Sequence, residues 1–512
     1  MLLPDLIRQI PVLEAAGGGT ASVAVTMICS DSREVLPGAL FVAVRGFAAD
    51  GHRFIRSAVE RGASAVLCEE FPPLLPDPSV PYLRVEDARK ALALAARRFY
   101  DFASDALNII GVTGTNGKTT TARLVTTMLN ACGVKAGYIG TNLCAFNDLE
   151  IPLERTTPEA HILHALFRRM LDGGCTAAVM EVSSHALVLQ RVYGITFRAA
   201  VFTNLSMEHL DFHETMQEYA RAKQQLFDQL APDGFAVINS DDPWAEAMVS
   251  KIKPEKRLCC TLDRTVPVAA DAARRYSAGI ISQSIASATI RLCFPDTQQT
   301  INTVLPGRYN VMNLLEAAAV GSGMGLSSHA VATALNAMPE VAGRMERILV
   351  PGRQEFAFVD YAHTPDALFN ALSTLNALKA PAARLVVVFG CGGNRDRMKR
   401  PEMGRIAAEN ADLVILTSDN PRDEDPEKII DEIEKGMTEH NHKRITDRAL
   451  AVRTAVALLQ PGDVLLVAGK GHEQYQETAG KKHFFSDQET LRIAFIQENS
   501  GEPETESVCR DY

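Results

Sequence analysis

The sequence lacks several features that would assign it to a specialised class of protein. Its ten cysteines include no C-x-x-C pair, so we predict neither a zinc site nor a disulfide framework and expect a reducing compartment. No apolar run approaches the roughly 20 residues that a membrane-spanning helix needs. The first residues are mixed and acidic, unlike a signal peptide. We therefore expect a cytoplasmic protein with no membrane partner.

An excess of positive charge is also missing, because the formal net charge is −10 at pH 7. This balance argues against a general nucleic-acid binder, although local basic clusters can still hold anionic ligands. The composition, with 46% hydrophobic and 22% charged residues, is that of a globular protein. A chain of 512 residues is too long for one core and predicts about three domains.

The most informative stretch is a glycine-rich turn between an apolar segment at 107–110 and a helix-like pattern from 121. It reads Gly111-Val112-Thr113-Gly114-Thr115-Asn116-Gly117-Lys118-Thr119-Thr120. Glycines let backbone N–H groups face phosphate oxygens, and a lysine and a hydroxyl at these places suit the β/γ-phosphates and Mg²⁺. The general pattern would have glycine at 112, where valine stands, and an ordinary strand-to-helix turn is the alternative. We predict a nucleoside triphosphate site.

Two later strands of the same region also end in polar residues. Glu181 follows the apolar segment 177–180, where a Mg²⁺-handling acid belongs beside a phosphate-loop strand; the alternative is a surface glutamate that caps a loop. His209 follows the segment 199–202. A lone histidine is more often structural, but His209 is predicted to share one sheet edge with Lys118 and Glu181.

Lys223 is an anomaly in the helix predicted from about 216 to 230. It lies four residues after Tyr219 in an apolar stripe. Two interpretations are open: a stem that covers apolar surface and extends its amine to water, or a partly desolvated lysine with a lowered pKa, fit for chemistry or modification. Asn310 and Asn313, at the start of a later helix, are either caps or ligand-facing groups.

Four strands of the region after residue 340 end in polar clusters, which predicts a doubly wound sheet with a site at its carboxyl edge. The clusters begin at Asp360, Gly390, Thr417 and Gly469. Gly390 and Gly392 partly match a dinucleotide fingerprint, but Arg and Asp follow, so we reject NAD. Instead, positive charge at strand ends suits capture of carboxylates; solvated loop charges are the alternative. The residues concerned are Arg395, Arg397, Arg422 and Lys470.

The predicted fold class is therefore α/β with three domains. Residues 1–105 form a small N-terminal α/β domain, 106–338 a central parallel-sheet domain with the phosphate loop, and 339–498 a C-terminal Rossmann-like domain. Residues 499–512 are polar and acidic, which predicts a disordered tail. In the first domain, Ser30, Ser32 and Arg33 taken alone read as a helix cap and a solvated charge.

Three motifs of the sequence are characteristic when they occur together: Gly114-Thr115-Asn116-Gly117-Lys118-Thr119-Thr120, Glu181-Val182-Ser183-Ser184-His185 and Asp419-Asn420-Pro421-Arg422. With these motifs the chain resembles, along nearly its whole length, the Mur ligases of bacterial peptidoglycan synthesis. In that family the Asp-Asn-Pro-Arg motif accompanies meso-diaminopimelate as the amino acid, whereas lysine-adding relatives carry another residue in place of Arg422. The chemistry agrees, since the second carboxylate of diaminopimelate matches a guanidinium.

The resemblance implies an ATP-dependent, Mg²⁺-assisted amide ligation. The γ-phosphoryl group passes to the D-Glu carboxylate of UDP-MurNAc-L-Ala-D-Glu and gives an acyl phosphate. The amine of meso-diaminopimelate attacks it, and a tetrahedral intermediate expels phosphate. Because the ligand groups come from three domains, we expect hinge closure on binding. We expect a monomer with no nucleic-acid partner.

The resemblance also implies a role for each matching residue. The catalytic residues would be Lys118, Glu181, His209 and Lys223. Metal ligands would be Thr119, Glu181, His209 and Lys223, the last as a carbamate that turns its cation into an anion beside a second Mg²⁺. Residues that hold ATP would be Gly114, Thr115, Asn116, Gly117, Lys118, Thr119, Thr120, Asn310, Arg344 and Asp360.

The same resemblance implies three substrate sites. The UDP site would contain Ser30, Ser32, Phe47, Ala48 and Ala49. The muramoyl-dipeptide site would contain Thr156, Thr157, Ser183 and Arg191. The amino-acid site would contain Arg395, Asp419, Asn420, Pro421, Arg422, Gly469 and Glu473.

The sequence departs from the family pattern at Leu189, where some relatives carry a substrate-binding Gln, and at Glu208 and Asn394, where we expect Asp. Two other functions remain to be distinguished. A folylpolyglutamate synthase or another Mur ligase would share the phosphate loop but not Asp-Asn-Pro-Arg. A nucleotide-binding regulator without catalysis would not need Lys118, Glu181, His209 and Lys223 together.

Overall fold

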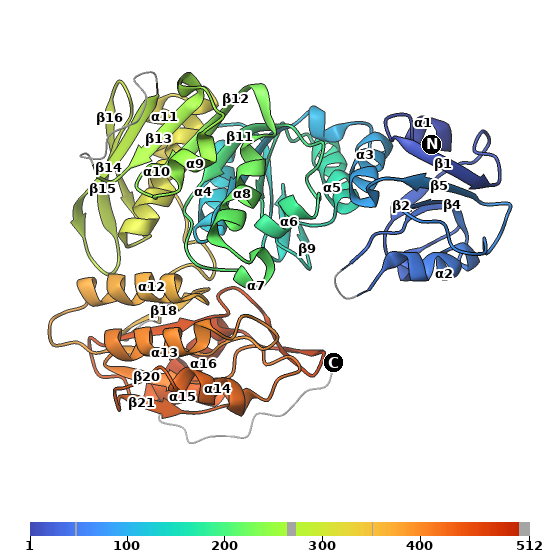
Figure 1. Ribbon diagram of the computed structural model, residues 1–512. Helices are drawn as coiled ribbons and strands as arrows, with labels where there is room; N and C mark the ends of the chain where they lie inside the picture. Colours follow the sequence, from blue (N-terminus) through green and yellow to red (C-terminus); the bar gives the residue numbers. More distant parts are fainter. Residues whose placement is uncertain (47–48, 264–272, 351, 501–512) are drawn as a thin grey trace. The chain divides into compact units, whose positions relative to one another are not determined.

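The computed structural model describes residues 1–46, 49–263, 273–350 and 352–500 (Figure 1). Three main sheets, together with a separate two-stranded one, confirm the predicted α/β class. The chain divides into two compact units: residues 1–205, 215–276 and 316–334 form the first, and 206–214, 277–315 and 335 onward form the second. The predicted domain borders at 105, 338 and 498 stay predictions. Phe47, Ala48 and the tail from 501 lie outside the described residues.

The first unit begins with a five-stranded sheet of order β1-β5-β4-β3-β2, parallel except for the β1–β5 pair. Alternate residues of β3 and β4 enter two apolar clusters, one on each face of the sheet. The strands are β1 (Val12–Gly17), β2 (Met27–Cys29), β3 (Ala39–Val42), β4 (Ala63–Cys68) and β5 (Pro81–Val85), and the helices are α1 (Leu3–Leu6), α2 (Ile55–Glu60) and α3 (Ala88–Phe99).

The second sheet of this unit carries the phosphate loop. Its order within this unit is β13-β12-β11-β6-β10-β7-β8-β9, and the pairs from β13 to β7 are parallel, as predicted. The antiparallel hairpin β8–β9, which the sequence analysis missed, turns at Asn147 with φ 51°. The strands are β6 (Asn108–Thr113), β7 (Ala136–Gly140), β8 (Leu143–Phe146), β9 (Leu149–Pro152), β10 (Ala177–Glu181), β11 (Phe197–Phe202), β12 (Leu230–Asn239) and β13 (Arg257–Thr261).

Helices α5 and α8 share one apolar cluster with strands of this sheet, through residues such as Phe167, Phe227 and Met180. The prediction that α8 reaches residue 230 is wrong, because Leu230 pairs with Phe197 of β11 and so begins a strand. The helices are α4 (Lys118–Ala131), α5 (Ala160–Asp172), α6 (Ser184–Val188), α8 (Met216–Phe227) and α9 (Ala245–Val249); α10 (Arg308–Gly323) and α11 (Ser328–Asn336) contain residues of both units.

The second unit contains a six-stranded sheet of order β17-β18-β22-β19-β20-β21, parallel except for the β17–β18 pair. Helices α12, α13 and α14 share an apolar cluster with one face, and α15 and α16 with the other, which confirms the doubly wound arrangement. The strands are β17 (Glu346–Ile348), β18 (Phe356–Asp360), β19 (Leu385–Phe389), β20 (Leu413–Leu416), β21 (His442–Arg444) and β22 (Val464–Ala468).

Its other elements complete the unit. An antiparallel hairpin pairs β23 with β24, and β15 pairs antiparallel with β14 and β16. The strands are β14 (Arg274–Gln283, whose first residues belong to the first unit), β15 (Ala288–Cys293), β16 (Gln298–Thr303), β23 (Tyr475–Thr478) and β24 (Lys481–Phe484); the helices are α7 (Leu210–His213), α12 (Pro365–Leu378), α13 (Lys399–Asn410), α14 (Pro426–Glu434), α15 (Arg448–Ala457) and α16 (Asp487–Ser500).

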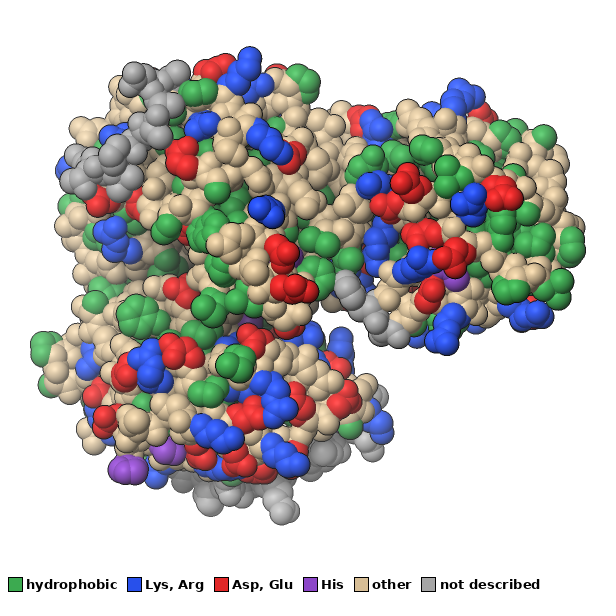
Figure 2. Space-filling model, in the orientation of Figure 1, with side chains coloured by type: hydrophobic (Ala, Val, Ile, Leu, Met, Phe, Trp, Pro, Cys, Tyr) green, Lys and Arg blue, Asp and Glu red, His purple; other side chains and the backbone are tan. Residues whose placement is uncertain are grey.

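The described residues also bear on membrane association and on surface charge. None of their helices combines the length and the hydropathy that a membrane crossing requires. On the face shown in Figure 2, acidic and basic side chains are interspersed.

Candidate functional site

The glycine-rich turn lies between β6 and α4, as the sequence predicts. Gly117 precedes the first residue of α4 with φ 85°, a conformation that favours glycine. A Cβ atom on Gly114 would lie 1.9 Å from the Thr203 hydroxyl oxygen. Both glycines are therefore required by backbone geometry, and the turn delivers its N–H groups and the N-terminus of α4 to one place.

The end of β11 supports this turn. The Thr115 N–H donates to the carbonyl oxygen of Asn204, and the Asn116 N–H donates to its side-chain oxygen, each at 2.9 Å. The Thr203 hydroxyl donates to the Asn116 carbonyl at 2.5 Å. Thr203 and Asn204 are not predicted from the sequence as supports of this turn, because nothing in one sequence pairs them with residue 116.

Lys118 folds back over the turn. Its Nζ donates to the carbonyls of Gly114 at 3.0 Å and Thr115 at 2.8 Å. The ammonium charge is thus held at the mouth of the turn, where the phosphate prediction requires it.

Glu181, at the end of β10, is fully buried. Its Oε1 accepts hydrogen bonds from the Tyr138 hydroxyl at 2.6 Å and the Thr141 N–H at 3.0 Å. Its Oε2 accepts from the hydroxyls of Thr119 at 3.0 Å and Thr141 at 3.3 Å. The alternative of a surface glutamate is wrong. The structure brings together Thr119 and Glu181, as the sequence analysis expected of two metal ligands.

Lys223 is also buried, with a relative exposure of 1%. Its Nζ donates to the Gly114 carbonyl at 2.7 Å and lies 4.4 Å from the centroid of the Tyr219 ring. The Tyr219 hydroxyl is in turn 3.2 Å from the Thr115 hydroxyl. Of the two open interpretations, the amine that extends to water is therefore excluded, and Lys223 points at the phosphate loop.

A second group of polar residues adjoins Glu181. The Thr157 hydroxyl donates to the Glu181 carbonyl at 2.8 Å and accepts from the Ser183 N–H at 3.1 Å. The Arg191 guanidinium contacts the Thr157 carbonyl at 3.1 Å and Glu159 at 3.0 Å, and its buried Nε has no hydrogen-bond partner among the described residues. Burial lowers the pKa of Arg191. Thr156 joins the group through the Thr141 hydroxyl at 3.2 Å.

His209 belongs to the second unit, so its predicted place beside Lys118 and Glu181 stays a prediction. Its Nε2 lies 3.6 Å from Glu208, whose other oxygen lies 3.5 Å from His363. Asn310 lies inside α10, and its side-chain amide donates to the Pro306 carbonyl at 2.8 Å. It therefore does not accept from a helix amide there as a cap would.

Arg344 and Asp360, predicted to hold ATP, lie close together in the second unit. The Arg344 guanidinium lies 4.5 Å from the centroid of the Tyr361 ring. The Asp360 carboxylate accepts from the N–H groups of Met345 at 2.6 Å and Ala362 at 2.8 Å. Burial raises the pKa of Asp360 above its ordinary value.

The ends of β20 and β22 meet in a buried polar cluster. The Lys470 Nζ donates to the Asn420 side chain at 2.9 Å and lies 3.3 Å from Glu473, which also accepts from the Asn420 amide at 2.9 Å. A Cβ atom on Gly469 would lie 2.6 Å from the Asp419 carboxylate. Burial raises the pKa of Asp419, but the charges of Lys470 and Arg448 outweigh it, and the pKa lies below its ordinary value.

The predicted concentration of positive charge holds only in part. Arg422 has φ 53°, donates to the Gly393 carbonyl at 2.8 Å and lies 3.4 Å from Glu477. Burial and the charge of Arg422 lower the pKa of Arg395. Arg397 is likewise paired with Glu432, and Lys470 with Glu473, so these charges are compensated within the protein.

The predicted UDP residues lie in the N-terminal sheet region. Ser30 follows β2, Ser32 is buried at the start of a short 3₁₀ helix, and the Ala49 carbonyl accepts from the Gly46 N–H at 2.9 Å. Asp31, rather than a serine, caps that helix, and exposed Arg33 pairs with Asp31, so the solvated charge is confirmed.

The donors present fit magnesium but no cage made of protein alone. No group of three or more His, Cys, Asp and Glu side chains in the described ranges could hold a metal ion. A carboxylate and a hydroxyl, Glu181 and Thr119, are nevertheless what a Mg²⁺ ion needs when phosphate oxygens and water supply its other ligands.

The fold and this site define a nucleotide-binding α/β protein with an additional doubly wound part. Family models match residues 24–100 (Mur ligase family, catalytic domain), 112–321 (Mur ligase middle domain) and 343–471 (Mur ligase, glutamate ligase domain). The chain belongs to the Mur ligase family.

Individual relatives match over the whole chain. The UDP-N-acetylmuramoyl-L-alanyl-D-glutamate–2,6-diaminopimelate ligase of Chlorobium phaeobacteroides is 81% identical over 510 residues, with 100% of both chains covered. The ligase of the same name from Chlorobaculum tepidum is 59% identical, with 97% of each covered. A solved structure under that name shares 32% identity with a TM-score of 0.67, covering 98% of this chain and 99% of the other.

Proposed function

We propose that this chain joins meso-2,6-diaminopimelate to the D-Glu carboxylate of UDP-MurNAc-L-Ala-D-Glu at the expense of ATP, in peptidoglycan precursor synthesis. The observation that carries the proposal is the 81% identity, over the whole of both chains, with a ligase whose name states this amino acid and this acceptor. The reaction class is acyl-phosphate chemistry: phosphoryl transfer to a carboxylate, then attack by an amine.

The phosphate loop serves the first step. Its N–H groups and the N-terminus of α4 bind the phosphates, and Lys118 neutralises charge that develops on the γ-phosphoryl oxygens. Lys118 already lies over the turn through its bonds to Gly114 and Thr115, so little reorganisation is needed.

Thr119 and Glu181 are the residues that would hold Mg²⁺. The hydrogen bonds of Tyr138 and Thr141 fix the Glu181 carboxylate, so its oxygens are oriented before any ion binds. When bound, the ion would screen the negative charge shared by the phosphates and the acceptor carboxylate. His209 and the carbamate proposed on Lys223 complete the set of ligands.

Lys223 is the residue proposed to carry a carbamate. An unprotonated Nζ attacks carbon dioxide, an N–C bond forms, and one proton leaves; the nitrogen keeps one hydrogen, which can still be donated to the Gly114 carbonyl. The product is an anion in place of a cation.

The acceptor carboxylate is proposed to lie near Arg191. Among the described residues, the Nε of this buried guanidinium is a donor without an acceptor, and Thr157 and Ser183 hold the neighbouring backbone. At the other end of the reaction, Arg395 and Arg422 bind the second carboxylate of diaminopimelate, while Asp419, Asn420 and Glu473 receive its ammonium and amine groups.

The test is phosphate release by the purified chain with ATP, Mg²⁺ and UDP-MurNAc-L-Ala-D-Glu, over a panel of amino acids. We expect release with meso-diaminopimelate and much less with L-lysine, which lacks the second carboxylate. The proposal is wrong if no amino acid stimulates release, and its amino-acid assignment is wrong if lysine is preferred.

A further inference from the structure

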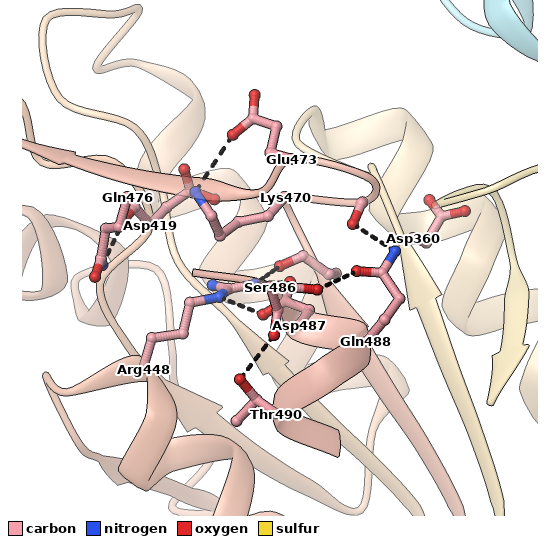
Figure 3. Close-up of polar contacts among 12 residues, drawn as sticks. Asp360, Asp419, Arg448, Lys470, Glu473, Gln476, Ser486, Asp487, Gln488 and Thr490 are labelled. Atoms are coloured by element: carbon pink, nitrogen blue, oxygen red, sulfur yellow. Dashed lines mark hydrogen bonds and ion pairs between the residues drawn. The ribbon is translucent and has the colours of Figure 1, made fainter. Parts of the chain in front are cut away.

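One ion pair of the second unit is completely buried, so it cannot contact a ligand at the surface. The side chains of Arg448, the first residue of α15, and Asp487, the first residue of α16, are both fully inaccessible. The Arg448 Nε and Nη2 each lie 2.8 Å from one oxygen of the Asp487 carboxylate, a bidentate pair (Figure 3).

The remaining donors of Arg448 reach the ends of two strands. Its Nη2 donates to the Ala468 carbonyl at 3.0 Å and its Nη1 to the Ser418 carbonyl at 3.4 Å. Each of these residues immediately precedes a residue of the proposed amino-acid site, Gly469 and Asp419 respectively. One guanidinium therefore ties together β22, the segment after β20 and the first residue of α16.

The buried polar cluster at the ends of β20 and β22 depends on the distance between these two strand ends, which the Arg448–Asp487 pair sets. Lys470 and Asn420 share a hydrogen bond of 2.9 Å. Gln476 donates to the Asp419 carbonyl at 2.7 Å (Figure 3). A side chain at position 469 would displace the Asp419 carboxylate, because a Cβ atom there would lie 2.6 Å from it. A change in the Ser418–Ala468 spacing would therefore displace the side chains of Asp419 and Lys470.

Stability alone does not account for such a pair. A buried ion pair is often no more stable than well-packed apolar residues of the same volume, because desolvation offsets the attraction. We propose that Arg448 and Asp487 are positioning residues that hold residues 418–422 and 468–473 at the spacing needed to bind the amino-acid substrate. This inference rests on the proposed function for its choice of substrate.

The test is a double variant that removes both charges, Arg448→Met with Asp487→Leu, beside the single change Arg448→Met. The single variant leaves a buried carboxylate without a partner and is expected to lower the thermal midpoint strongly. The double variant restores apolar packing and most of that midpoint. If the pair positions the site, the KM for diaminopimelate stays raised about 10-fold to 100-fold in the double variant.

Arg384→Met is the matched control. Arg384 precedes β19 and pairs with Asp463, which precedes β22, so this pair joins the amino ends of strands in the same sheet. Its loss is expected to leave the KM for diaminopimelate within about twofold of wild type. The KM for the UDP substrate should stay within the same range in all variants. A double variant with a wild-type KM, or a control with an equal rise, overturns the proposal.

Hydrogen exchange on the same proteins separates this proposal from the function on which it rests. Amides within 417–424 and 466–476 should exchange faster in the double variant and at the wild-type rate in Arg384→Met; unchanged exchange in the double variant overturns the positioning role. Wild-type protein that releases no phosphate with diaminopimelate overturns the proposed function instead, and the exchange result still decides whether the pair holds the two segments.

Discussion

Lys223 shows how much about one side chain follows from its position in the sequence and how much requires the folded structure. Its place in an apolar stripe predicted either burial or an amine that extends to water, and the sequence could not decide between the two. The structure shows burial: the amine lies 2.7 Å from the carbonyl of Gly114, which follows β6. Side-chain periodicity locates a residue on a helix face, but only the packed sheet supplies its partner.

Replacing Lys223 with Ala should lower kcat about 100-fold or more, because the charge beside the phosphate loop is lost. The cost in folding should be about 1–3 kcal/mol, that of one buried hydrogen bond and its desolvated partner. Steady-state rates and thermal melts measure both. Lys223→Met, which keeps most of the volume, controls for packing. A wild-type rate in either variant would remove Lys223 from the chemistry, and recovery of Lys223→Ala by added short carboxylates would support the carbamate.

Arg422→Ala should raise the KM for diaminopimelate by about 10-fold or more, since a guanidinium–carboxylate pair is lost from the site. Arg397→Ala is the control, because Arg397 is exposed and paired with Glu432. The two KM values, measured at saturating ATP, decide the matter. An unchanged KM in Arg422→Ala would exclude this residue from recognition of the amino acid.

At the scale of elements, strand ends were the most predictable feature. Apolar runs followed by Glu181, Asp360, Thr417 or Gly469 mark the carboxyl ends of parallel strands, and four strands of the structure end at or immediately before these residues. The antiparallel additions β8, β9 and β14–β16 were missed, because their alternating residues carry no functional cluster. Arg448 and Asp487 were missed for another reason: their pairing joins residues 39 positions apart.

The ion pair between Arg397, which precedes α13, and Glu432 of α14 predicts a dependence on acid. The hydrogen bond from Arg397 lowers the pKa of Glu432 from 4.5 to about 2. Its stabilising contribution is therefore complete above about pH 4.5 and is lost as the pH falls through about 2. Hydrogen exchange of the segment 426–434 in urea gives its unfolding midpoint. This urea midpoint should fall between about pH 4.5 and pH 2 in wild type and fall less in Glu432→Gln. Equal pH dependence in both proteins would contradict the assignment.

At the scale of the whole molecule, the proposed ligand groups are divided between the two units. Lys118, Glu181 and Lys223 belong to the first, whereas Arg344 and Arg422 belong to the second. One reaction needs both sets on the same substrates, so we expect the units to close on binding. The resemblance to the Mur ligases predicted this need, because the matched residues lie in three segments of the chain. The sequence carries no signal for the arrangement itself.

Solution scattering tests closure directly. The radius of gyration should decrease when a non-hydrolysable ATP analogue and UDP-MurNAc-L-Ala-D-Glu are added together, and less with either alone. The analogue with UDP-MurNAc alone is the control, because it lacks the D-Glu carboxylate. No compaction with the full set of ligands would contradict the closure prediction.

The central claim is that the D-Glu carboxylate is phosphorylated before the amine attacks. The most direct measurement uses UDP-MurNAc-L-Ala-D-Glu labelled with oxygen-18 in that carboxylate, with ATP and meso-diaminopimelate, and mass spectrometry of the phosphate released. The account predicts one labelled oxygen in each phosphate, because the bridging oxygen of an acyl phosphate leaves with phosphorus. Amide product accompanied by unlabelled phosphate would contradict it.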